Sequence, residues 1–496
     1  MERNRSVTTN ARTNCLLLAA LIFAWTCAAA QTGPAMNSYS AGATDTGSNA
    51  PTVSMQPASG DNPFQGSAPP GPVQPGVVPL SLNDAITRGL KYNLGVLISD
   101  QATQQARGAR IHALSKLLPQ ISAGASETSE QINLKALGFP NFPGVPAIIG
   151  PFGVFDVRGY LDQPILDLED LHKEKAESEN VKAAQYTYQN ARDIVVLVSA
   201  NLYLQAIAGS SRVNSARAQV ETAQAVYDRA VDMKKTGIVP GIDVLRSQVE
   251  LQAQQQRLIY LQNQFETEKL TLARAIGLPV AQQFNLTDTV PYSPPPPITV
   301  EQALTRALAT RADYKGLLAQ VRAAESLKKA ARSEALPSLN FKADYGDIGP
   351  TPGDSHGTYT VAASVKVPLF QGGKVRGDVM QADALVKQRQ SELSDLQNKI
   401  EYQVRTSFLD LTSSEAQVHV AQNTQDLAHE QLTQARDRFT AGVVNSLEVV
   451  QAQEAVATAE ENYISSLYRY NIAKASLARA LGLAEETFKQ MTGGSK

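Results

Sequence analysis

The chain has 496 residues, of which 43% are hydrophobic and 19% charged, and its formal net charge is −2. No cluster of basic residues accompanies this near-neutral charge, so the composition excludes the basic surface that nucleic-acid binding requires. Both cysteines, Cys15 and Cys27, lie in the first thirty residues. The rest of the chain therefore has no thiol for a disulfide, a metal site or a nucleophile.

Residues 1–30 are predicted to be a secretory signal peptide. Three arginines precede the apolar run LLLAALIFAW, and AAA stands before Gln31 as a cleavage site would. The run is too short for a permanent transmembrane helix, and no later apolar run reaches about 18 residues. An alternative uses Cys27 as the acylated residue of a lipoprotein, although the preceding AWT suits that signal poorly.

Residues 31–79 are predicted to form a disordered leader. This stretch has no Lys or Arg and is rich in Gly, Pro, Ser, Ala and Thr. Such a composition buries too little apolar surface to offset the entropy of ordering the chain.

Two similar segments, 80–290 and 299–484, make up most of the remaining chain. Each predicts a helix, two strands, a long helix, a break and a further helix. The matching stretches are SLNDAITRGL with TVEQALTRAL, KLLPQISAGA with EALPSLNFKA, and LARAIGL with LARALGL. Internal similarity of this kind indicates a duplicated unit. A proline-rich linker, 291–298, joins the segments, and a tail, 485–496, follows.

Helix lengths predict how each segment packs. Residues 170–235 contain no proline and a single glycine, Gly209, and residues 374–440 form a similar run. A helix of this size spans roughly 98 Å at 1.5 Å per residue. The shorter predicted helices of the first segment, 84–117 and 242–276, together match that length. We therefore predict that they stack end to end beside the long helix.

Each helix after a break repeats apolar residues every seven positions. These residues are Val244, Leu251, Leu258, Phe265 and Leu272 in the first segment, and Val449, Val456, Tyr463, Tyr470 and Leu477 in the second. A sustained heptad predicts a left-handed coiled coil.

The strands show a period of two. Apolar residues alternate from Tyr359 and from Leu339 in the second segment, and from Phe155 and, more weakly, Ile121 in the first. Four strands cannot close a barrel alone, and open edges in lipid leave backbone groups unsatisfied, so a membrane location requires several chains to share one barrel. The Gly- and Pro-rich residues 133–155 are predicted to be an extracellular loop.

Two related stretches interrupt the helices, KKTGIVPGIDVLRSQ and FTAGVVNSLEVVQAQ. Their glycines, Gly237 and Gly442, lie 205 residues apart, as do Leu272 and Leu477. Each predicts the turn of a helical hairpin, and both turns are expected at the same end.

In this order and in duplicate, these features resemble the TolC family of outer-membrane efflux and secretion channels. The resemblance covers about residues 80–483. It rests on the paired helix openings, the LP before the first strand of each segment, QPILD and VPLFQGG after the second strands, and the tips TGIVPGIDVL and AGVVNSLEVV.

The resemblance implies a mainly α fold with a membrane β-barrel contribution. A homotrimer would place a twelve-stranded barrel in outer-membrane lipid, above a periplasmic α-barrel of coiled-coil hairpins. It implies no enzymatic activity, no cofactor and no metal site. The partners would be a periplasmic adaptor and an inner-membrane pump of the resistance-nodulation-division or ABC type, with no nucleic acid.

The resemblance also implies adaptor-docking tips. Gly237 and Gly442 correspond to the family's tip glycines, and Ile238, Val239 and Val443 flank them.

A pore gate is implied beside these tips. The acidic ring of the family corresponds to Glu448, with Asp243 expected nearby from the other hairpin. A second acid one turn later is replaced by Gln451, and the basic residue of the closing lock is replaced by Val444. We therefore expect apolar contacts, including those of Leu447, to hold the gate shut.

Alternative interpretations remain for these residues and for the whole chain. Asp243 and Glu448 also suit helix N-termini through the helix dipole, as does Ser446 as a cap. A periplasmic adaptor also has long helical hairpins, but it would show one hairpin rather than two. The acids at 167, 169 and 170 fit helix-start chemistry better than catalysis, and the five histidines show no metal-ligand spacing.

Overall fold

A computed structural model describes residues 62–485 except 70, 74, 137, 139–145, 289–291, 293, 295–296, 442 and 445. The predicted signal peptide, the alternative acylation site Cys27 and the tip glycine Gly442 lie outside the described residues. So do half of the linker 291–298 and nearly all of the tail 485–496.

Helices dominate the described chain. They are α2 (Leu82–Tyr92), α3 (Leu94–Ser115), α4 (Leu168–Lys235), α5 (Gly241–Ile276), α6 (Val300–Thr310), α7 (Ala312–Ser333), α8 (Lys374–Thr440) and α9 (Ser446–Ala480). The strands are β1 (Val78–Leu80), β2 (Gln120–Asn133), β3 (Ile148–Leu166), β4 (Phe284–Leu286), β5 (Ser338–Gly349) and β6 (His356–Lys366). Short 3₁₀ turns cover Pro63–Gln65 and Pro352–Asp354. The order helix, helix, strand, strand, long helix, helix therefore occurs twice.

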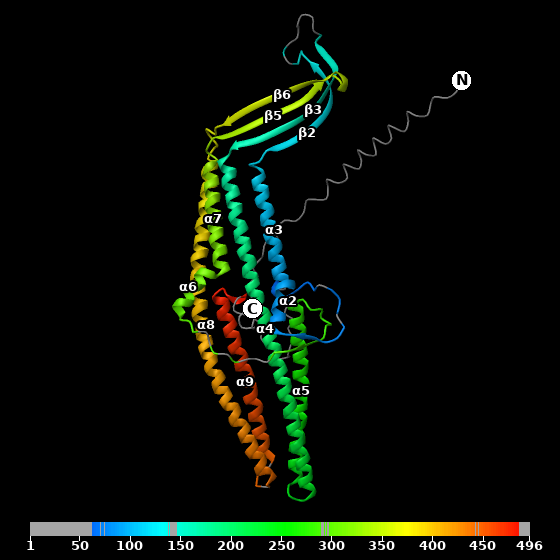
Figure 1. Cartoon of the computed structure of the whole chain (residues 1–496), viewed down its shortest axis with the longest axis vertical. Helices are drawn as coiled ribbons and strands as arrows, with labels where there is room; N and C mark the ends of the chain where they lie inside the picture. The colour runs from blue at the N-terminus through cyan, green and yellow to red at the C-terminus, as the bar shows by residue number, and fades with distance from the viewer. Residues whose placement is uncertain are drawn as a thin grey trace, which may run out of the picture. The chain divides into compact units, whose positions relative to one another are not determined.

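The four long strands form one antiparallel sheet in the order β2-β3-β5-β6. The sheet stands at one end of α3, α4, α7 and α8, and the turns of the α4–α5 and α8–α9 hairpins stand at the other end (Figure 1). The pairing is continuous across the sheet, with Ile121 opposite Leu161, Leu161 opposite Ala343, and Ala343 opposite Val361.

The shorter helices stack end to end along the long ones, which confirms the prediction from helix lengths. The amide Nδ2 of Asn93, between α2 and α3, donates to the carbonyl oxygen of Ala275 near the end of α5 (3.0 Å). Similarly, Nη1 of Arg311, between α6 and α7, reaches the carbonyl oxygen of Ala480 at the end of α9 (3.4 Å). We call these two places the first joint and the second joint.

Local sequence explains where the helices begin. Ser81 and Asp84 form a capping box at the start of α2, and Thr299 and Gln302 form another at the start of α6. The carboxylate of Asp167 accepts the backbone N–H of Asp170 (3.0 Å) and caps α4. The acidic residues 167, 169 and 170 thus stabilise the start of α4, which agrees with their interpretation as helix-start residues rather than catalytic ones.

Three sequence-based boundaries are wrong. The helix predicted over 84–117 is two helices, because Asn93 takes an extended backbone conformation and caps α3 with its own side chain. The predicted leader 31–79 contains regular structure near its end, since Pro63–Gln65 form a 3₁₀ turn and β1 pairs with β4 in a small parallel sheet. The predicted loop 133–155 is shorter than expected because β3 already begins at residue 148.

The two heptads differ in burial. In α9, four of the five heptad residues are buried, and Tyr463 is half-buried. In α5 only Leu251 and Leu272 are buried. The helix α9 packs between α4 and α8, whereas α5 packs chiefly on α4.

Among the described residues, one helix, α4, is apolar enough over 18 residues to cross a membrane by composition alone. More than half of that window, 56%, is buried inside the protein, as expected for the central helix of a bundle. Its single glycine, Gly209, leaves room for the carboxylate of Glu268, because a Cβ there would stand 2.2 Å from Oε2.

Candidate functional site: the hairpin tips and the sheet

The first tip is a helix stop that requires glycine. Gly237 has φ +76°, and its N–H donates to the carbonyl of Lys234 (3.1 Å), while the N–H of Ile238 donates to that of Met233 (2.9 Å). These two bonds form a Schellman motif, which favours glycine at the left-handed position. In the second tip, Val443 N–H donates to the carbonyl of Arg438 (3.0 Å), which is the corresponding bond.

The tips combine exposed and buried apolar residues. Ile238 and Val443 are 61% and 70% exposed. Val239 and Val444, by contrast, pack against one cluster that draws on both hairpins. The buried members of this cluster are Val226, Met233, Ala428, Leu432, Ala435, Phe439, Val449, Ala452, Val456 and Ala459. Exposed and inward-facing apolar residues therefore alternate at both turns.

Asp243 joins the two tips. Its carboxylate accepts the hydroxyl of Ser446 at 3.0 Å, and Arg246 lies 3.6 Å away on the same helix. The side chain of Asp243 is only 5% exposed, and Ser446 is fully buried. Within one chain, Asp243 is thus a buried tie between α5 and α9 rather than an open carboxylate.

Glu448 has a basic partner that sequence reasoning missed. Nη1 of Arg438, near the end of α8, lies 2.5 Å from Oε1 of Glu448. Glu448 keeps 37% of its side chain exposed, and Gln451 and Leu447 are exposed on the same helix. The partner comes from six residues before the position where the family motif has its base, so no local motif pointed to it.

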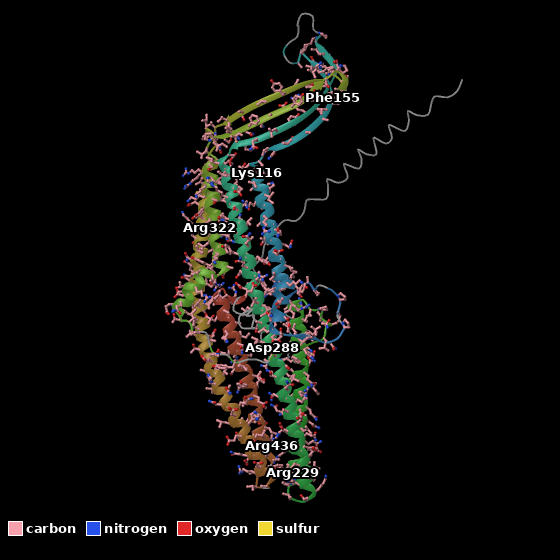
Figure 2. All side chains as sticks on the ribbon, in the orientation of Figure 1. Lys116, Phe155, Arg229, Asp288, Arg322 and Arg436 are labelled. Atoms are coloured by element: carbon pink, nitrogen blue, oxygen red, sulfur yellow. The ribbon has the colours of Figure 1, made fainter. Side chains whose placement is uncertain are left out.

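A groove of about 500 Å³ runs between α4 and α8 above the tips. Arg229 of α4 and Arg436 of α8 line it, and both stand near the hairpin turns (Figure 2). Thr222, Thr440 and Glu221 complete its polar lining. No sequence motif indicated this groove, because its walls are formed by Arg229 and Arg436, about two hundred residues apart in the chain.

One face of the sheet is apolar and exposed. The register places Ile121, Leu161, Val361 and the adjacent aromatic pair Tyr345 and Tyr359 on this face. Tyr359 and Ile121 are 75% and 81% exposed. A water-facing sheet would not present such a face, whereas a lipid-facing sheet requires it. Phe155 lies toward the far end of β3 (Figure 2).

The opposite face of the sheet is polar. Arg158 lies between Asp344 and Asp156, and its Nη2 donates to the hydroxyl of Thr358 (3.0 Å). Within the described residues, β2 and β6 pair on one side only. The sheet therefore has one apolar face, one polar face and two open edges in the described chain.

Among the described residues, no group of three or more His, Cys, Asp or Glu could hold a metal ion. Within the helical body, burial raises the pKa of Glu268, whose carboxylate accepts hydrogen bonds from Gln205 and Gln264, and burial also raises the pKa of Asp193.

Long helical hairpins that end in a four-stranded sheet with one exposed apolar face are the arrangement to compare with known proteins. Residues 303–483 match the family model described as outer membrane efflux protein. The pyoverdine export outer membrane protein OpmQ of Pseudomonas aeruginosa is 24% identical over 61% of this chain. The chain spans 64% of the length of that relative. TolC of Escherichia coli is 21% identical, over 75% of this chain and 76% of its own length.

Solved structures share the fold. The Campylobacter jejuni CmeC outer membrane channel superposes with a TM-score of 0.69 at 18% identity, over 83% of this chain and 88% of its own. The outer membrane protein VceC of Vibrio cholerae gives 0.69 at 16% identity, over 81% and 96%. The chain is thus similar to the TolC family of outer-membrane efflux proteins, and the relatives that it resembles are named as outer membrane proteins.

Proposed function

We propose that this protein is the exit duct of a tripartite efflux or secretion system. It conducts cargo passively from a periplasmic tunnel to the exterior after docking to an adaptor and an inner-membrane pump. The observation that carries this proposal is the sheet. It has an exposed apolar face and two open edges, and its strands lead directly into the long helices. An adaptor would not need a sheet with a lipid-facing side.

The working unit in this proposal is a homotrimer of an internally duplicated chain. Three four-stranded sheets would close a twelve-stranded barrel and satisfy the open edges of β2 and β6. The exposed apolar residues of α5, which include Ile242, Leu245 and Val249, would then meet a neighbouring chain. In mild detergent we expect a trimer that resists dissociation, and a monodisperse monomer with four paired strands would contradict this.

The docking surface for the adaptor in this proposal is the pair of tips. Ile238 and Val443 offer exposed apolar contacts, and the turn at Gly237 lets a partner approach the backbone. Gly442, the other docking glycine in this proposal, lies outside the described residues. The groove lined by Arg229 and Arg436 would receive an acidic partner side chain. The pump would be of the resistance-nodulation-division or ABC type.

The gate in this proposal lies at the same end. Three copies of Glu448 would ring the periplasmic entrance, and Val444, Leu447 and Gln451 would stand beside them. Asp243 would hold each second hairpin to the first through Ser446. A ring of carboxylates raises the local cation concentration, so we expect a cation-selective channel. The pairing of Glu448 with Arg438 moderates that selectivity.

Conductance in planar lipid bilayers tests the proposed function. The purified full-length protein should insert and give stepwise, cation-selective currents. An adaptor would give no such steps, and neither would a protein whose sheet faces water. Absence of steps from a detergent-stable trimer that binds lipid vesicles would overturn the channel assignment.

A further inference from the structure

The second joint contains a cavity that the channel function does not use. Its volume is about 420 Å³, and it lies where α9 ends and α7 begins, against α4 and α8. The polar and charged lining residues are Asn190, Arg311, Asp313, Lys399, Gln403, Thr406, Ser407, Ser476 and Arg479. Three of these are cations and only one is an acid.

The single acid is already neutralised. Arg311, which is 3% exposed, holds Asp313 with two hydrogen bonds, Nε to Oδ1 (3.0 Å) and Nη2 to Oδ2 (2.6 Å). Its Nη1 donates to the side-chain oxygen of Gln403 (2.8 Å). The buried pair thus carries no net charge into the cavity, and two cations remain.

These two cations are incompletely compensated. Lys399 is exposed, and its side chain makes no ion pair or hydrogen bond with another residue of the described chain. Arg479 donates from Nη2 to the amide oxygen of Asn190 (2.5 Å). Burial, and then the like charge of Arg311, lower the pKa of Arg479, although Asp313 and Asp193 of α4 act in the opposite direction. An anion here would relieve this unfavourable burial of positive charge.

Comparison with the first joint shows which residues of the second joint suit a helix end and which are available to bind a ligand. The 205-residue offset pairs Arg479 with Arg274, so an arginine near this helix end occurs in both segments and suits the helix dipole. The same offset pairs Lys399, Gln403 and Ser407 with an apolar set: Ile194, Val198 and Leu202. Leu202 packs against the buried cluster of the first joint. The polar stripe is therefore specific to the second joint and is not needed to build such a joint.

We propose that the cavity at the second joint binds a small soluble oxyanion, a carboxylate or a phosphate. A guanidinium offers paired donors to two oxygens of such a group, and an ammonium adds a point charge. A lipid headgroup is an unsuitable source, because the 22 residues of α7 separate the joint from the sheet by roughly 33 Å. The volume falls in the range of small-molecule pockets.

Titration calorimetry on the full-length protein in detergent tests this proposal. Inorganic phosphate and succinate are each titrated at fixed ionic strength, with chloride as the reference anion. We expect at least one of them to bind tightly enough to measure in the millimolar range or below, with a single site per chain. The ratio of the two affinities then decides between phosphate and carboxylate.

Matched variants locate the site. Lys399→Ile introduces the residue that occupies the corresponding position of the first joint, and it should weaken anion binding at least tenfold. Lys387→Ile removes another exposed lysine of the same helix, which pairs with Asp383 outside the cavity (2.9 Å), and should leave binding unchanged. Thermal unfolding checks that both variants are folded, and Lys399→Gln replaces Lys399→Ile if the latter is not.

Three results would overturn the proposal. Neither anion binds better than chloride, Lys399→Ile binds like the wild type, or Lys387→Ile weakens binding equally. All the lining residues come from one chain, and the readout is binding in detergent. A failure of the channel proposal would therefore leave this result intact, and the reverse also holds.

Discussion

The two joints solve one structural problem with different chemistry. The first uses the neutral, fully buried Asn93, whose Nδ2 donates to the carbonyls of Phe64 (2.7 Å) and Ala275 (3.0 Å). The second uses the charged, buried Arg311 together with Asp313. A neutral amide with satisfied partners tolerates burial, whereas a guanidinium requires its carboxylate. The first joint is thus a packed structural element, and the second retains charge and space.

The aromatic residue at the centre of each joint also differs, being more deeply buried in the first joint than in the second. In the first, Tyr203 is fully buried, and its hydroxyl lies 2.9 Å from both the carbonyl of Leu80 and the carboxylate of Asp288. Asp288 stands at the level of this joint (Figure 2). The offset pairs Tyr203 with Phe408, which has no hydroxyl and is only partly buried. The first joint therefore depends more on its central aromatic residue.

The largest expected effect sharpens that difference. Tyr203→Ala removes a buried ring and leaves Asp288 with fewer donors, so it should lower the free energy of unfolding by about 3–5 kcal/mol. Phe408→Ala should lower it by about 2 kcal/mol, because Phe408 is partly exposed. Thermal unfolding in detergent gives both values. Equal losses would mean that the two joints are mechanically equivalent.

The next effect concerns the charged pair. Arg311→Asn gives the second joint the residue of the first and leaves Asp313 without its partner, so it should cost about 3 kcal/mol at neutral pH. The corresponding change in the first joint, Asn93→Ala, loses only neutral hydrogen bonds and should cost about 1–2 kcal/mol. If Arg311→Asn leaves the free energy of unfolding unchanged, the Arg311–Asp313 pair does not stabilise the fold.

The pH dependence of this loss identifies its cause. Burial raises the pKa of Asp313, but the hydrogen bonds and charge of Arg311, with the charge of Arg479, outweigh burial and place the pKa below its ordinary value. A lowered folded-state pKa gives stability above the unfolded pKa, near 3.9, that is lost as the pH falls through the folded value. In Arg311→Asn burial dominates and this contribution reverses. The gap between variant and wild type should therefore shrink on acidification.

Much of this organisation could be predicted from residues alone. The heptads after Gly237 and Gly442, the long proline-free runs and the period-two strands specified the hairpins and the sheet, because each reflects a local backbone period. The joints could not be predicted. Asn93 caps α3 locally, but its buried amide is satisfied by the carbonyls of Phe64 and of Ala275, the latter 182 residues later in the chain. The Arg438–Glu448 pair likewise depends on a turn that brings two helix ends together.

The tips extend the comparison to function. Arg438 pairs with Glu448 at the second tip, whereas Asp243 at the first is buried against Ser446. We expect Leu447→Asp to raise single-channel conductance several-fold, because it places charge in the apolar contact that we propose closes the gate. Glu448→Gln should mainly reduce cation selectivity, and Arg438→Gln should increase it by freeing the carboxylate. Reversal potentials across a salt gradient measure the selectivity of both variants. If Glu448→Gln leaves the selectivity unchanged, Glu448 acts only as a helix-start residue.

The smallest effect is expected where the two tips touch. Ser446→Ala removes the hydroxyl that the carboxylate of Asp243 accepts, and Asp243 keeps only Arg246, 3.6 Å away, as a charged neighbour. The loss of one hydrogen bond to a charged group should cost about 1–2 kcal/mol and raise the frequency of brief openings without changing selectivity. Ser247→Ala is the matched control, because its hydroxyl donates to the carbonyls of Asp243 and Val244 within α5 and joins no second hairpin. If both variants open equally often, the contact between the tips does not hold the hairpins together. If only Ser446→Ala does, the first hairpin is the fixed support against which the second one moves.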